Sequence, residues 1–226
     1  NPDIICLPEC ANIMTANKSH LVKHATLQKD CPVLEECIQF AKKYNKFVSV
    51  GSLLLKKNNS SKLLNRSFFI NHSGKIMAYY DKIHLFDVNI NRKEVHRESK
   101  SFHKGNKVVI VTSPWGKIGL TICYDIRFPN LYRNLVKQGV KIILVPAAFT
   151  VPTGKDHWEI LLRSRAIENT SFIIATGQCG KHHARRATYG HSMIVNPWGK
   201  IIIKGSYKPK VINAMIDMRD VENVRS

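Results

Sequence analysis

Apolar residues in this chain of 226 residues fall into short runs separated by polar turns. Residues 3–7 and 47–55 form two such runs, and their length is typical of buried strands. The segment that begins at Pro32 carries apolar residues at the i, i+3, i+4, i+7 spacing of an amphipathic helix. The pattern therefore predicts a protein that mixes helices and strands.

Three similar segments predict β-hairpins, namely residues 71–76, 113–118 and 196–201. Each joins two apolar stretches through a turn that ends in Gly, which supplies the positive φ that such loops need before the second strand. Because the three hairpins recur at irregular spacing, they indicate one antiparallel-rich layer rather than a solenoid.

The pattern changes between the second and third hairpins to strand, helix, strand, helix, strand. The expected elements are strand 117–122, a helix that begins near Pro129 and ends before Gly139, strand 142–145, helix 156–169 and strand 171–176. This series implies parallel strands joined by helical crossovers.

Hairpins and crossovers together predict a mixed sheet, or two packed sheets, covered by helices. Residues 86–106 are polar without a clear period, so we expect a long loop near the site. Because no Ser/Gly-rich linker interrupts the chain, residues 1–226 are interpreted as a single domain.

Composition and charge narrow the class of protein. The chain is 44% hydrophobic and 23% charged, as in ordinary globular proteins, and no apolar run approaches the ~20 residues of a membrane span. The formal net charge of +19 suits an anionic partner, but the basic residues are scattered rather than clustered, which favours a generally basic surface over a nucleic-acid interface. A basic nucleic-acid-binding module stays an alternative, although Trp115 and Trp198 lie in hairpin turns where we expect them to pack.

Six cysteines occur without a CxxC pair, so a zinc ribbon is not expected and a reducing compartment is favoured. The chain begins with Asn1 and Pro2, and no signal peptide is in view. We therefore expect a cytoplasmic protein, with organelle targeting left open because the N-terminus looks incomplete.

Three residues of reactive type directly follow apolar strands. Glu9 follows residues 3–7, Lys82 follows 75–80, and Cys123 follows 118–122 before a predicted helix start. An α/β sheet gathers its site at strand ends, and helix N–H groups there can lower the pKa of a thiol. A glutamate can accept a thiol proton, and a lysine can stabilise the oxyanion that forms on attack. The trio predicts a cysteine nucleophile with a base and a cation.

The residues around this trio resemble the motifs of the nitrilase, or carbon–nitrogen hydrolase, superfamily. Residues 7–9 are similar to its glutamate motif, residues 80–85 (Tyr-Asp-Lys-Ile-His-Leu) to its lysine motif, and residues 119–129 (Gly-Leu-Thr-Ile-Cys-Tyr-Asp-Ile-Arg-Phe-Pro) to its cysteine motif. Residues 157–169 also resemble the family, so the likeness covers nearly the whole chain.

The resemblance implies an α/β fold, an α-β-β-α sandwich of two mixed sheets flanked by helices. It also implies an amidase that cleaves a linear C–N bond through a thioester, with no metal or organic cofactor. In that scheme Glu9 is the base, Lys82 the oxyanion support and Cys123 the nucleophile. The Tyr124 backbone N–H is the second oxyanion donor, and Glu98 is the second glutamate beside the lysine.

One stretch narrows the resemblance further, because residues 178–193 resemble the branch that hydrolyses deaminated glutathione. The small substrate would then be anionic, and Arg185 and Arg186 are candidates to bind its carboxylates, since guanidinium pairs bidentately with them. A solvated basic loop at 181–186 is the plain alternative for either arginine. An omega-amidase acting on an omega-amide of a dicarboxylic acid is the alternative activity, and the family also implies a homodimer.

The chain departs from the family at both ends. The family's first strand and helix, upstream of the glutamate motif, and its C-terminal segment are not found in residues 1–226. Because a missing central strand exposes sheet edges, a non-catalytic fragment stays a third possibility.

Overall fold

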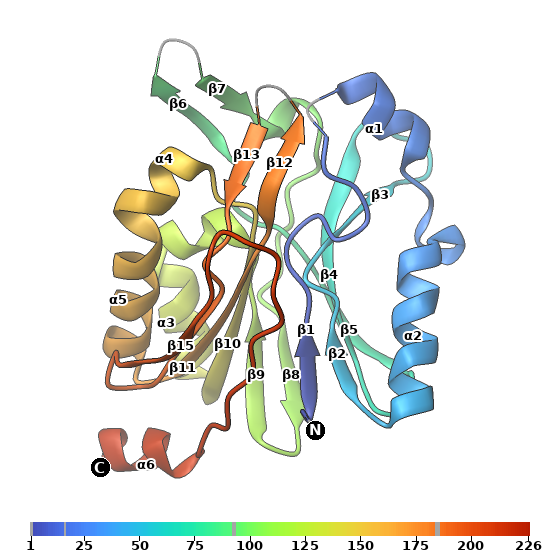
Figure 1. The fold of residues 1–226 in the computed structure, drawn as a ribbon. Helices are drawn as coiled ribbons and strands as arrows, with labels where there is room; N and C mark the ends of the chain where they lie inside the picture. The colour runs from blue at the N-terminus through green and yellow to red at the C-terminus, as the bar shows by residue number, and fades with distance from the viewer. Residues whose placement is uncertain (1, 16, 92–93, 184–185) are drawn as a thin grey trace.

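In the computed structural model two β-sheets pack face to face between layers of helices (Figure 1). The structure describes residues 2–15, 17–91, 94–183 and 186–226. The architecture is the predicted mixed α/β arrangement of two sheets flanked by helices.

The first sheet is built around β4 (Leu63–Ile70). One edge of β4 pairs with β2 and β3, and its other edge pairs with β5. The other members of this sheet are β1 (Ile4–Cys6), β2 (Phe47–Ser49), β3 (Leu53–Lys56) and β5 (Ile76–Asp81). Helix α2 (Pro32–Tyr44) covers its outer face, where Leu34 and Ala41 pack on apolar side chains of the sheet. The helix begins at the proline that the sequence indicated, because Pro suits the first turn.

The second sheet has six strands in the order β15-β14-β11-β10-β9-β8. They are β8 (Ile110–Ser113), β9 (Gly116–Leu120), β10 (Val140–Ala147), β11 (Phe172–Gly177), β14 (Met193–Val195) and β15 (Ile201–Lys204). Strands β9, β10 and β11 are parallel, as the crossover pattern predicted, while β8, β14 and β15 pair antiparallel. Helices α3 (Pro129–Lys137) and α5 (Glu159–Asn169) supply apolar side chains to the core beneath this sheet.

Apolar side chains of both sheets share one core, which includes Phe47, Phe69 and Tyr80 from the first sheet and Ile118 and Leu120 from the second. Burial of this apolar area drives the two sheets together, since each Å² removed from water contributes about 25 cal/mol. The three predicted hairpins are confirmed as β4–β5, β8–β9 and β14–β15. The expectation that they form one layer is wrong, because β4–β5 lies in the first sheet and the other two in the second.

The run 47–55 is two strands rather than the single strand that we expected. The break falls at Gly51, whose φ of +66° is a left-handed conformation that L side chains rarely adopt. A Cβ there would lie 2.1 Å from the carbonyl oxygen of Pro8, so only glycine allows this turn to contact the backbone that leads to Glu9.

Residues 86–106 are not the long loop that we expected. They contain a two-stranded hairpin, β6 (Asp87–Asn91) with β7 (Glu94–Arg97), and a short 3-10 helix at Glu98–Lys100. The expected loop at 181–186 likewise belongs largely to a second hairpin, β12 (Cys179–His183) with β13 (Arg186–Tyr189). A free-standing hairpin satisfies its backbone by pairing and needs no apolar period, which is why polar sequence concealed both.

Helix boundaries also differ in places. The helix expected at 156–169 begins earlier, with α4 (Val151–Thr153) and a π-helical turn at Gly154–Trp158 before α5. Helices α1 (Lys18–His24) and α6 (Arg219–Arg225) were not predicted.

Trp115 packs edge-on against Phe47, but the expectation for Trp198 is wrong, since that side chain is 75% exposed. Among the described residues, no helix has the length and apolar character to cross a membrane.

Candidate active site

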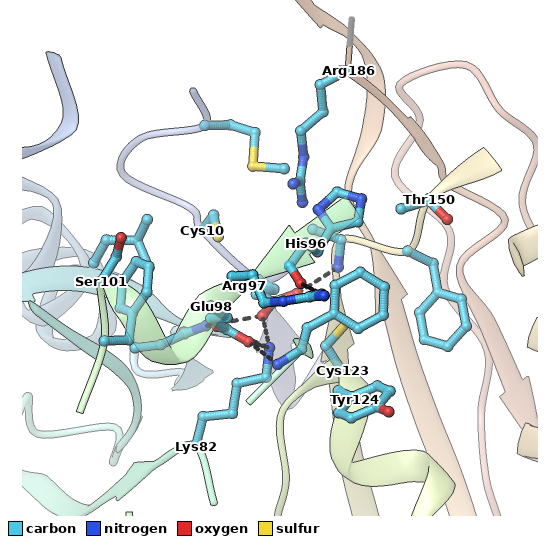
Figure 2. A pocket seen from close by; sticks show the side chains of 18 of the residues that line it. Cys10, Lys82, His96, Arg97, Glu98, Ser101, Cys123, Tyr124, Thr150 and Arg186 are labelled. Atoms are coloured by element: carbon cyan, nitrogen blue, oxygen red, sulfur yellow. Dashed lines mark hydrogen bonds and ion pairs between the residues drawn. The ribbon is translucent and has the colours of Figure 1, made fainter. Parts of the chain in front are cut away.

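A cavity of about 400 Å³ opens at one edge of the sandwich, where strands of both sheets end (Figure 2). We call its buried polar cluster, Glu9, Asn65, Lys82, Glu98 and Cys123, the floor of the pocket. We call the two hairpins β6–β7 and β12–β13, which both extend beyond the main sheets at the top of Figure 1 and contribute residues to the cavity lining, its rim.

Glu9 lies just beyond β1 and is buried, with both carboxylate oxygens hydrogen-bonded. Oε1 accepts from Lys82 Nζ and from Asn65 Nδ2, both at 2.9 Å, and Oε2 accepts from the Ala148 backbone N–H at 2.7 Å. Burial raises the pKa of Glu9, but the charge of Lys82 and these hydrogen bonds outweigh it and hold the pKa below its ordinary value. Glu9 is therefore an ionised acceptor at neutral pH.

Lys82 lies directly after β5 and is clamped between two carboxylates. Its Nζ is 2.9 Å from Glu9 Oε1 and 3.0 Å from Glu98 Oε2. Burial lowers the pKa of Lys82, yet the two carboxylates more than compensate and raise it well above its ordinary value. Glu98 is itself held by the Phe86 backbone N–H, which donates to Oε2 at 2.6 Å. The floor thus presents a fixed cation.

Cys123 lies between β9 and α3 at the start of a 3-10 helix, Cys123–Arg127, with a φ of +49°. Its thiol is buried within hydrogen-bonding reach of the Glu9 carboxylate. Burial raises the pKa of the thiol well above its ordinary value, Glu9 raises it further, and Lys82 opposes the shift. The expectation that helix N–H groups lower this pKa is therefore wrong, because desolvation is the larger effect and α3 begins only at Pro129.

A buried carboxylate that we did not single out fastens the Cys123 turn to the lysine strand. Asp125 Oδ2 accepts from the Tyr80 hydroxyl at 2.7 Å and from the Ile122 N–H at 2.8 Å. Its Oδ1 lies 2.7 Å from His84 Nδ1 and accepts from the His84 backbone N–H at 3.0 Å. These contacts link the segment around Lys82 to the turn that carries Cys123.

Asn65 is the second floor residue that the motifs did not reveal. It lies within β4 and is 2% exposed. Asn65 alternates with the buried Leu63 and Ser67 along β4, so it faces the inside of the fold, and a buried amide there needs partners.

The remaining candidates are the arginines of β12–β13 and Tyr124, which directly follows Cys123. Among the described residues, the buried side-chain nitrogen and oxygen atoms without a hydrogen-bond partner are Asn65 Oδ1 and Arg186 Nε. Figure 2 shows the Arg186 side chain pointing from β13 into the cavity, opposite Lys82. The Tyr124 ring packs edge-on against Phe86 at 5.1 Å. Arg185 lies outside the described residues.

The described part of the chain contains no group of three or more His, Cys, Asp or Glu side chains placed to hold a metal ion. His182 Nε2 lies 2.7 Å from the Thr188 hydroxyl on the neighbouring strand.

Known proteins share both the sequence and the fold. A deaminated glutathione amidase from Yersinia enterocolitica is 39% identical over 99% of this chain and 78% of its own length. A deaminated glutathione amidase from Dictyostelium discoideum is 40% identical over 88% of this chain and 71% of its own. The crystal structure of the C. elegans NitFhit protein matches 99% of this chain with a TM-score of 0.90 and 37% identity, and this chain spans 54% of that one.

The family model described as carbon-nitrogen hydrolase matches residues 1–226. The α/β sandwich of this chain superimposes on NitFhit, and its pocket places a buried thiol beside a Glu–Lys ion pair. The chain therefore belongs to the carbon–nitrogen hydrolase family.

Proposed function

We propose that this chain is a cysteine-dependent amidase that hydrolyses deaminated glutathione. The observation that carries the reaction is the buried Glu9–Lys82 ion pair beside the Cys123 thiol at the floor of the pocket. The substrate is suggested by relatives of about 40% identity that are named deaminated glutathione amidases.

The protonation states set the order of the first step. The raised pKa of Cys123 keeps the sulfur as a thiol, and the lowered pKa of Glu9 keeps its carboxylate ready to accept a proton. Glu9 takes the thiol proton as Sγ attacks the amide carbonyl carbon, so no free thiolate has to persist in the buried site.

The negative charge that forms on the carbonyl oxygen is the second requirement. Lys82 Nζ and the Tyr124 backbone N–H are the proposed donors to this oxyanion, and Lys82 is held in place by Glu9 and Glu98. Because the lysine is already ordered, its charge stabilises the intermediate without reorganisation during the reaction.

Collapse of the intermediate breaks the C–N bond, and the amine leaves with the proton that Glu9 had accepted. The acyl group then remains on Cys123 as a thioester. Glu9 next removes a proton from a water molecule, whose oxygen attacks the thioester carbonyl. The C–S bond breaks, the thiol regains its proton, and the carboxylic acid is released.

Trapping of the acyl-enzyme tests this proposal. Incubation with an electrophilic amide analogue, followed by peptide mass spectrometry, should place the adduct on Cys123, and Cys123→Ala should abolish turnover with its fold retained. Cys37 is the matched control, since it is more accessible and lies on α2, away from the floor. Labelling confined to Cys10 or Cys179 would contradict the assignment.

We propose that Arg186 binds a substrate carboxylate. The guanidinium lies in the pocket with a buried Nε that has no partner among the described residues. Its strand is held against the pocket wall, because the Tyr189 N–H donates to the Phe149 carbonyl at 2.9 Å. A guanidinium that enters the pocket with an unpaired Nε–H suits a carboxylate. Faster turnover of a short dicarboxylic omega-amide than of deaminated glutathione would instead identify an omega-amidase.

We also propose that a second copy of the chain covers the outer face of α5. Ile160 and Ile167 on that helix are 66% and 53% exposed, and the β14–β15 turn, which carries the exposed Trp198, reaches Ile167 through Gly199. Sedimentation should give a dimer, and Ile160→Lys should give a monomer. A monomeric wild-type protein would contradict this arrangement.

A further inference from the structure

The side chain of Asn65 bridges the two carboxylates of the floor. Its Nδ2 donates to Glu9 Oε1 at 2.9 Å and to Glu98 Oε1 at 3.2 Å. Lys82 Nζ contacts the same two carboxylates, so one cation and one neutral amide share them. The Asn65 backbone also takes part, because its carbonyl accepts from the Lys82 N–H at 3.0 Å.

The oxygen of the Asn65 amide, in contrast, is buried and lacks a hydrogen-bond partner among the described residues. Leaving a buried acceptor unpaired is unfavourable, and rotating the amide would be worse because its oxygen would then face two carboxylates. The chain therefore accepts an unpaired oxygen in order to keep both N–H groups on Glu9 and Glu98.

We propose that Asn65 is a positioning residue for the amidase reaction, which fixes the Glu9 and Glu98 carboxylates on either side of Lys82 and holds Glu9 Oε2 toward the Cys123 thiol. Two carboxylates around a single lysine leave one negative charge uncompensated, and the two N–H donors of Asn65 stabilise it without adding a charge. Oε1 is then fully occupied by Lys82 and Asn65, which leaves Oε2 for the Ala148 N–H and the thiol.

This role predicts a change in pH dependence. Hydrogen bonds to the ionised form lower a carboxyl pKa, so removing them raises the pKa of Glu9 and moves the acid limb of activity to higher pH. The titratable and charged groups that face Glu9 are Lys82, Glu98, Cys123, Cys10 and, across the pocket, Arg186. Asn65→Leu leaves all of these in place and removes the two donors.

Asn65→Asp separates electrostatics from shape. Asp has nearly the shape of Asn, so a purely structural role predicts that Asn65→Asp is the milder variant. A third carboxylate beside Glu9 and Glu98 predicts the opposite. We expect the acid-side midpoint of kcat/KM to rise by about one pH unit in Asn65→Leu, as one lost hydrogen bond to a charged group implies, and by more in Asn65→Asp. In both variants kcat should fall at least tenfold while KM changes less than twofold.

The experiment measures kcat/KM against pH and, separately, the pH dependence of Cys123 alkylation by iodoacetamide, which needs no turnover. Asn169→Leu is the matched control, because Asn169 is another buried asparagine whose Nδ2 donates to a carbonyl and a carboxylate, at the end of α5. It should lower the melting temperature and leave both pH profiles unchanged. If Asn65→Leu does not fold, Asn65→Ser takes its place.

Unchanged midpoints in Asn65→Asp and the Leu or Ser variant, at a stability loss equal to that of Asn169→Leu, would overturn the inference. The inference rests on the proposed function, and Glu9→Gln keeps the two apart. If Glu9→Gln does not change the alkylation profile of Cys123, the base assignment itself fails. If it does and the Asn65 variants do not, the positioning role alone fails.

Discussion

The floor and the rim of the pocket are built in different ways. Apart from Glu98, which directly follows β7, the floor residues lie at the ends or in the interior of strands of the two main sheets and are buried. Their side chains bond mainly to one another, as the Glu9–Lys82 pair at 2.9 Å shows. Rim side chains come from two-stranded hairpins outside the main sheets. Arg97 on β7 is exposed, and Arg186 on β13 keeps an unpaired Nε in the cavity.

On the proposed function, this difference divides the pocket into a floor for the chemistry and a rim for recognition of the substrate. Catalytic groups need fixed distances, which residues on or next to the strands of the two sheets can provide when their charged groups hold one another by ion pairs and hydrogen bonds. A group that reads the substrate has to keep donors available until the substrate arrives. Changes in the floor should therefore affect every amide, and changes in the rim should affect only substrates with the matching charge.

The largest effects are expected in the floor. Glu9→Gln removes the proposed base and Lys82→Met removes the proposed oxyanion donor, so each should lower kcat by about 10²–10⁴-fold on charged and neutral amides alike. Lys82→Arg should not restore activity, because a planar guanidinium does not fit between two carboxylates that clamp a compact ammonium. Steady-state kinetics on both amides measures this. Near-wild-type rates in either variant would remove that residue from the floor's chemistry.

The same floor predicts how stability depends on pH. The pKa of Glu9 is lower in the folded protein than in the unfolded chain, so its ion pair stabilises the fold above the ordinary glutamate range. That contribution is lost as the pH falls through the lowered value. In acid titrations followed by circular dichroism, Glu9→Gln should show a weaker loss of stability than the wild type. An equal loss would show that Glu9 is not stabilised as its contacts indicate.

The sequence predicted the floor of the pocket better than its rim. Buried strands need apolar runs, so the runs that precede Glu9, Lys82 and Cys123 could be recognised in the sequence. The structure brings these three residues together in one pocket. Asn65 and Asp125 were missed because each bonds to residues far away in the sequence. Glu9 is 56 positions from Asn65, and Tyr80 is 45 positions from Asp125. The rim hairpins were missed because pairing of their backbones leaves no apolar period.

A smaller, selective effect is expected at Arg186. Arg186→Gln should lower kcat/KM for deaminated glutathione by about ten- to a hundredfold, since a hydrogen bond between charged groups contributes about 1.5–3 kcal/mol and each factor of ten is 1.4 kcal/mol. A small neutral amide should be hydrolysed at nearly the wild-type rate. Equal losses on both substrates would show that β13 shapes the pocket without binding the substrate's charge.

The smallest effect is expected at the other rim arginine, which is the matched control for Arg186. Arg97 also lines the cavity, but its guanidinium is already engaged within its own hairpin. Nη1 donates to the Val88 and His96 carbonyls at 3.1 and 2.7 Å, and Nη2 donates to Asn89 Oδ1 at 2.7 Å.

Binding a carboxylate through Arg97 would require breaking these bonds, so its charge has little to offer the substrate. Arg97→Gln should therefore change kcat/KM by less than about threefold on either amide, while the exposed hairpin loses about 0.5–1.5 kcal/mol per missing hydrogen bond. Kinetics on both substrates, with proteolysis of the hairpin as the second readout, checks this. If Arg97→Gln lowered kcat/KM for deaminated glutathione as much as Arg186→Gln does, the comparison would fail. Recognition would then depend on the positive charge of the rim alone and not on whether its N–H donors are free.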